Sequence, residues 1–125
     1  MNDGVDKFCL DIIDYRGKRV VFLEVIRLKK AQKRPELRNE EFINGQLAKA
    51  IKYPDLVYED FERPNERLVY YYREYRKGNE TRYTKVVINI KYIPYRVVTA
   101  YRPDRIKEDC PKSKSKIIYD KSRDG

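Results

Sequence analysis

The sequence predicts an α+β fold: an N-terminal β-hairpin, two helices, and then a four-stranded antiparallel meander, with the helices packed on one sheet face. Three observations favour this class. Apolar residues alternate with polar ones near the start and again in the second half of the chain, as they do in strands. The stretch between them has apolar residues at three- and four-residue spacing, as in a helix. The connections in the second half are too short for crossovers, so we expect antiparallel pairing there.

The hairpin is expected in the first quarter of the chain. Apolar residues alternate along residues 8–14, and residues 15–18 form a turn. Residues 20–25 are an apolar run broken only by Glu24, which indicates a well-buried second strand.

Two helices are expected next. Residues 25–34 are rich in helix formers, and Pro35 ends this helix because the residue before a proline is pushed out of helical geometry. A second helix should run from Asn39, a plausible N-cap, to Lys52. Pro54 stops it.

The second half of the chain predicts the meander, and Gly78-Asn79 is a hairpin signal between its middle strands. The expected strands are residues 56–61, 67–75, 82–92 and 95–101. A short helix or turn is expected near residues 104–108. We therefore place a single domain at residues 1–108, followed by a basic, mobile tail at residues 109–125.

Composition excludes several kinds of chemistry. The chain has 125 residues and no histidine, which excludes a Ser-His-Asp triad, a Cys-His pair and a histidine-based zinc site or ribonuclease. The two cysteines, Cys9 and Cys110, have no metal-type spacing, and we expect neither a metal nor a cofactor. The start of the chain does not look like a signal peptide and no apolar run is long enough to span a membrane, so the sequence predicts a cytoplasmic protein without membrane contact.

Charge points to an anionic partner. The formal net charge is +9, which favours phosphate-rich or acidic molecules. One basic cluster lies at the end of the first expected helix and contains Lys29, Lys30, Lys33 and Arg34. At helical spacing these residues pair on shared faces, so the cluster can hold phosphates. The alternative is an exposed amphipathic helix.

Two strands carry further candidate residues. Tyrosines crowd the strand at residues 67–75, where Tyr72 and Arg73 offer stacking and phosphate contact; plain sheet packing of tyrosines is the alternative. In the last strand Thr99 and Tyr101 share a face, and the Thr99 hydroxyl is either bonded to backbone or available to a phosphate.

The order of these clusters resembles the barnase–EndoU–colicin–RelE superfamily of small phage and bacterial nuclease domains. The resemblance covers roughly residues 8–108. The matching pieces are Arg34-Pro35-Glu36-Leu37, Ala50-Ile51-Lys52-Tyr53-Pro54-Asp55-Leu56-Val57, Tyr70-Tyr71-Tyr72-Arg73, Val86-Val87-Ile88 and Val97-Val98-Thr99-Ala100-Tyr101. Lys29 and Arg34 stand where this superfamily often has histidines.

The resemblance implies a metal-independent ribonuclease of the toxin or phage type, in which the ribose 2′-OH attacks the adjacent phosphate. It implies Lys29, Arg34, Tyr72 and Thr99 as catalytic residues. Its substrate would be RNA, either tRNA or ribosome-bound mRNA, and an acidic antitoxin or immunity protein is a possible partner. Two alternatives stay open: a catalytically inactive RNA-binding domain of the same fold, and a basic protein-interaction module that binds an acidic partner. For RNA contact the expected residues are Lys30, Lys33, Arg73 and Tyr101.

Overall fold

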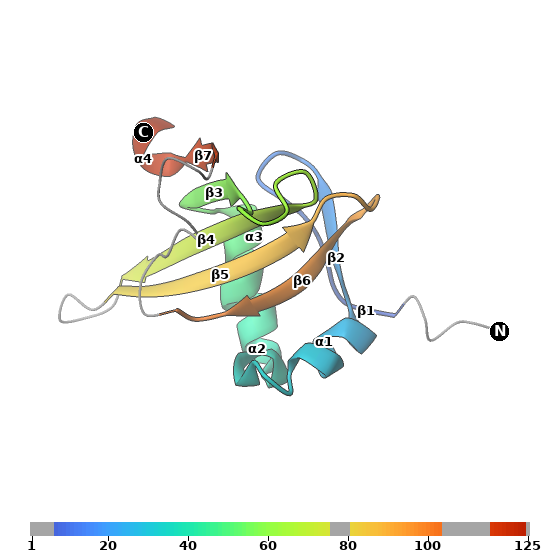
Figure 1. Ribbon diagram of the computed structural model, residues 1–125. Coiled ribbons are helices and arrows are strands. Elements are labelled where there is room, and N and C mark those ends of the chain that lie inside the picture. The colour runs from blue at the N-terminus through green and yellow to red at the C-terminus, as the bar shows by residue number, and fades with distance from the viewer. Residues whose placement is uncertain (1–6, 76–80, 104–115, 125) are drawn as a thin grey trace.

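The computed structural model describes residues 7–75, 81–103 and 116–124, and in this part of the chain all strands belong to one sheet (Figure 1). The strands are β1 (Phe8–Ile13), β2 (Arg19–Leu23), β3 (Leu56–Glu59), β4 (Arg67–Tyr75), β5 (Thr81–Asn89), β6 (Tyr95–Tyr101) and β7 (Ile117–Asp120). The helical segments are α1 (Glu24–Lys30), η1 (Pro35–Arg38), α2 (Glu40–Phe42), η2 (Ile43–Leu47), α3 (Ala48–Lys52) and α4 (Lys121–Asp124).

The predicted four-stranded sheet is wrong in size, because the sheet has seven strands in the order β1-β2-β6-β5-β4-β3-β7. The antiparallel order β3-β4-β5-β6 of the meander is present. The N-terminal hairpin joins it through a parallel pairing of β2 with β6. At the other edge, β7 comes from the segment that was expected to be a tail and pairs with β3. The structure is therefore one mixed sheet.

Burial explains why the hairpin joins the meander. Val20, Val21 and Phe22 are at most 1% exposed, so β2 is covered on both faces. A strand of this kind needs a neighbour on each side to satisfy its backbone groups, and β6 supplies the second one.

The helical region follows its local signals closely. Asn39 caps the segment from Glu40 to Lys52, since its side chain accepts a hydrogen bond of 2.8 Å from the Glu41 amide. The first helix is shorter than predicted, because after Lys30 the backbone tightens into a turn in which the Lys33 amide donates to the Lys30 carbonyl.

The helices and the sheet enclose the main core. The segment α2–η2–α3 packs on one face of the sheet, which we call the helix face (Figure 1). Phe42, Leu47 and Ile51 of this segment belong to one buried cluster with Tyr70 and Ile88 of the sheet. The other face, which we call the open face, holds a smaller cluster. Its buried members are Tyr58, Val69 and Tyr71. The helix face is therefore covered by the segment α2–η2–α3, whereas the open face holds this smaller cluster.

Two predicted features cannot be compared with the structure. The Gly78-Asn79 turn and the short helix or turn at residues 104–108 lie outside the described residues. The strand β4, which precedes the Gly78-Asn79 turn, ends at Tyr75. Among the residues that are described, no helix has both the length and the apolar composition to cross a membrane.

The Cys9 thiol on β1 supports a prediction about reactivity. Desolvation, with a smaller effect of the Glu24 carboxylate, raises its pKa from 9.0 to about 11. The thiolate is the reactive form, so at pH 8 we expect alkylation about 100-fold slower in the folded protein than after unfolding. Because the pKa is raised in the folded state, the stabilising effect of the neutral thiol is present below pH 9.0 and is lost as the pH rises toward 11.

The measurement is iodoacetamide labelling of a Cys110→Ser variant, followed by mass spectrometry with and without urea. Equal labelling rates in the two conditions would contradict the burial of Cys9.

Candidate functional site

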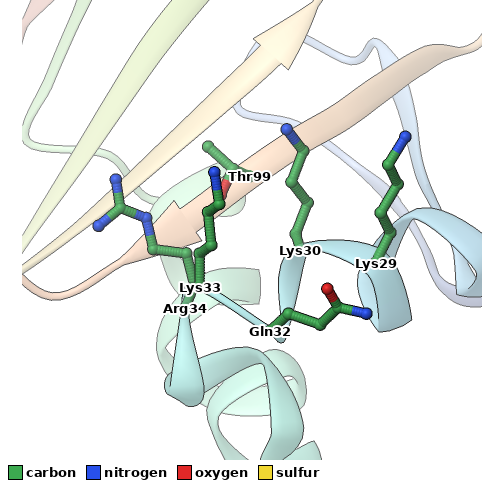
Figure 2. A pocket seen from close by; sticks show the side chains of 6 residues that line it. All are labelled: Lys29, Lys30, Gln32, Lys33, Arg34 and Thr99. Carbon is green, nitrogen blue, oxygen red and sulfur yellow. The ribbon is translucent and has the colours of Figure 1, made fainter.

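A pocket of about 440 Å³ lies between the end of α1 and the strand β6. Its lining residues are Lys29, Lys30, Gln32, Lys33, Arg34 and Thr99. Figure 2 shows the three lysine side chains extending from α1 and the following turn toward the strand that carries Thr99. Four of the six lining residues are basic and none is acidic. We call this the basic pocket.

The backbone after α1 brings these cations together. The amides of Lys33 and Arg34 both donate to the Lys30 carbonyl, at 3.1 and 2.9 Å, so the chain turns tightly there. Arg27 holds this turn from inside: its guanidinium is buried and donates to the Leu37 carbonyl at 2.9 Å and to the Glu24 carboxylate at 2.6 Å. A paired and buried arginine fixes the end of α1 without taking part in the pocket.

Thr99 faces the pocket because β6 is irregular. The register shifts between the pairs Val87↔Thr99 and Ile88↔Val97, which leaves Val98 as an extra residue. As a result Val97 and Ala100 both enter the core, whereas strict alternation along the strand would place Val97 on the same face as Thr99. The bulge thus turns Thr99 to the open face.

The Thr99 hydroxyl has no partner within the described part of the chain. Its Oγ1 atom is buried and forms no hydrogen bond with a described residue. A buried hydroxyl without a partner is costly, so one that lines a basic pocket points to a bound group that would satisfy it.

Arg34 and Tyr101 border the pocket as a stacked pair. The Arg34 guanidinium lies 3.9 Å from the centre of the Tyr101 ring. The end of β6 is held next to η1 because Glu36 accepts a 2.9 Å hydrogen bond from the Arg102 amide. This contact keeps the strand and the turn after α1 together.

Lys85 is a candidate that the sequence analysis missed. Lys85 on β5 pairs with Tyr101 on β6, and it is only 6% exposed. Its ammonium lies 5.6 Å from the Tyr101 ring and 5.9 Å from the Tyr71 ring. A lysine within a strand usually marks a solvated position, so only the pairing of β5 with β6 reveals its place among aromatic rings.

The tyrosine strand contributes less than expected. Tyr72 pairs with the buried Thr84 and packs against the main core, so it lies on the helix face, across the sheet from Thr99. Arg73 lies on the open face, where its guanidinium is 5.8 Å from the Tyr83 ring. It is separated from β6 by β5.

Of the predicted residues, the structure brings together one group and separates two others from it. The predicted residues that line the pocket are Lys29, Lys30, Lys33, Arg34 and Thr99, and Tyr101 adjoins them through its contact with Arg34. Arg73 shares only the face, and Tyr72 shares neither the face nor the pocket.

Comparison with known proteins gives no match: no family model, no curated protein and no solved structure matches this chain. The resemblance to the barnase–EndoU–colicin–RelE superfamily therefore stays a prediction.

Proposed function

We propose that this protein is an RNA-directed domain that holds a backbone phosphate in the basic pocket and cleaves the RNA there without a metal. The observation that carries the proposal is that four cationic side chains line the same pocket as a buried hydroxyl that has no partner among the described residues. Lysine and arginine supply most of the affinity of proteins for nucleic-acid phosphates, and a hydroxyl commonly adds a directed hydrogen bond. The net charge of +9 agrees with such a partner.

Cleavage in this pocket would follow from the chemistry of RNA itself. The 2′-OH attacks phosphorus, the bond to the 5′-oxygen breaks, and the products are a 2′,3′-cyclic phosphate and a 5′-hydroxyl. Arg34 and the three lysines would stabilise the negative charge that builds up on the phosphate oxygens. Thr99 would donate its hydrogen bond to one of them. Among the lining residues only a lysine amine, in its uncharged form, can accept the 2′-OH proton. The ammonium group of another lysine would donate the proton that the leaving 5′-oxygen takes up.

A second candidate is RNA binding without cleavage. The observation that favours it is the shortage of acid–base groups: the chain has no histidine, and Tyr72 lies on the helix face. The pocket offers a complete set of phosphate-binding groups but only lysine as a base.

The test offers tRNA, ribosome-bound mRNA and a single-stranded oligonucleotide to the purified protein in EDTA. The first proposal expects fragments that end in a 2′,3′-cyclic phosphate, and the second expects binding by fluorescence anisotropy with intact RNA. Absence of both cleavage and binding would overturn the two proposals together.

Replacing the Thr99 hydroxyl with a methyl group tests the part of this hydroxyl in RNA binding without changing how the side chain packs in the protein. Thr99→Val keeps the shape of the side chain, and we expect RNA affinity to fall about tenfold, the effect of a lost hydrogen bond to a charged group. Because the hydroxyl has no described protein partner, the urea midpoint should stay the same or rise.

The matched control is Thr84→Val, which makes the same chemical change at a buried position of the helix face. It should leave RNA affinity unchanged. Equal affinity of Thr99→Val and the wild-type protein would remove Thr99 from the site.

A further inference from the structure

One end of the sheet gathers three connections. The turn before β2 lies beside the start of β6, since Val20 pairs with Tyr95. The β5–β6 connection lies beside the β3–β4 connection, because the Ile90 amide donates to the Glu66 carbonyl at 2.8 Å. Side chains from all three segments therefore share one surface, which is distinct from the basic pocket.

This surface contains an apolar pocket with a cationic rim. Its volume is about 370 Å³, and its lining residues are Lys18, Arg19, Ile90, Ile93, Pro94 and Tyr95. Ile93 is 97% exposed, an extreme value for a large aliphatic side chain. Exposed apolar groups that gather beside a pocket are typical of a docking surface.

The same end of the sheet also carries an aromatic side chain with acidic neighbours, which suits the shape and charge of this pocket. Phe61, in the β3–β4 connection, is 40% exposed, and its neighbours in sequence are Asp60 and Glu62. An aromatic ring between two carboxylates complements an apolar pocket that carries the Lys18 ammonium on its rim. Arg19 also lines the pocket, but its guanidinium is already paired with Asp11. The pocket is large enough, since an apolar cavity of about 150 Å³ already accepts benzene.

We propose that two copies of this chain associate through this end, with Phe61 of each copy in the apolar pocket of the other. Both parts of the contact lie at one end of the molecule, so a two-fold axis there satisfies both contacts at once and closes the dimer. The chain itself carries the aromatic ring and the carboxylates that suit the pocket, which favours a second copy over an unrelated protein. The basic pocket is lined by other residues and stays accessible.

The contact is built from three short connections, so we expect a weak dimer that forms as protein concentration rises. Sedimentation equilibrium over a wide concentration range measures its dissociation constant. Phe61→Ala should raise that constant at least tenfold, as loss of a central aromatic anchor does. Leu28→Ala is the matched control, because Leu28 is 59% exposed on α1 and lies outside the apolar pocket.

A mixing experiment identifies the second copy as the occupant. Ile93→Asp spoils the pocket but keeps Phe61, whereas Phe61→Ala keeps the pocket. Neither variant alone can form a ring-in-pocket contact, but a mixture of the two can form one. We therefore expect stronger association in the mixture than in either variant alone. A wild-type protein that stays monomeric throughout, or a mixture that associates no better than its components, would overturn the proposal, and neither result bears on RNA binding.

Discussion

Replacing both Lys29 and Arg34 with alanine is expected to weaken RNA binding about 100-fold and to abolish any cleavage. Each substitution removes one charged group that donates a hydrogen bond to the phosphate. Both residues line the basic pocket, and Arg34 also stacks on Tyr101. The salt dependence should change as well. The slope of log affinity against log salt concentration should decrease by about two, one for each lost phosphate contact.

The matched control is the double variant Lys49→Ala/Lys52→Ala. It removes the same number of charges from exposed positions on α3, which packs on the helix face. Fluorescence anisotropy at several salt concentrations measures both variants. If the control loses as much affinity as the pocket variant, the overall charge of the protein binds RNA and the pocket has no special part.

Replacing Asp14 with alanine is expected to lower the free energy of unfolding by about 3 kcal/mol, the effect of breaking a buried hydrogen-bond network. Asp14 is 5% exposed. One carboxylate oxygen accepts from the amides of Arg16 and Lys18 at 2.9 and 2.8 Å, and the other accepts from the Tyr70 hydroxyl at 2.8 Å. Burial, and then the nearby Asp14, hold the pKa of the Tyr70 phenol well above its ordinary value. Without Asp14 this buried hydroxyl would lose its acceptor.

Urea denaturation at neutral pH measures the effect. Asp11→Ala is the control, because Asp11 forms its 2.7 Å ion pair with Arg19 at the surface, where water competes for both groups. Asp11→Ala should lower the free energy of unfolding much less than Asp14→Ala does. In the double variant Asp14→Ala/Tyr70→Phe the hydroxyl is absent, so we expect part of the lost stability to return. Equal effects of Asp14→Ala and Asp11→Ala would show that the network adds nothing.

Local signals in the sequence predicted individual elements well, but they did not predict the whole sheet. The bounds of β4 and β6 are as expected, and so is the N-cap at Asn39. The parallel pairing of β2 with β6 joins segments far apart in the chain, and no short pattern encodes it. The strand β7 has only a short apolar run after a polar, basic stretch, so its pairing with β3 depends on the tertiary context.

The candidate site was predictable where its residues are close in sequence, as for the cluster around Lys30 and Arg34, although a tight turn after α1 and not helical spacing brings these cations together. It was not predictable where it depends on which face of the sheet a residue occupies. Tyr72 differs from its neighbour Tyr71 only by one step of alternation, and that step places it on the helix face. Thr99 reaches the pocket because of the bulge at Val98, which has no clear signal in the sequence.

The position of β6 between β2 and β5 also decides when the basic pocket can exist. Its lysines belong to the first third of the chain, but its other wall, with Thr99, belongs to the strand that joins the hairpin to the meander. A growing chain on the ribosome therefore has no pocket until residues 95–101 have emerged and inserted between two strands already made. Such long-range pairing is slow compared with helix or hairpin formation. Incomplete chains released before this step would carry the positive charges without the site.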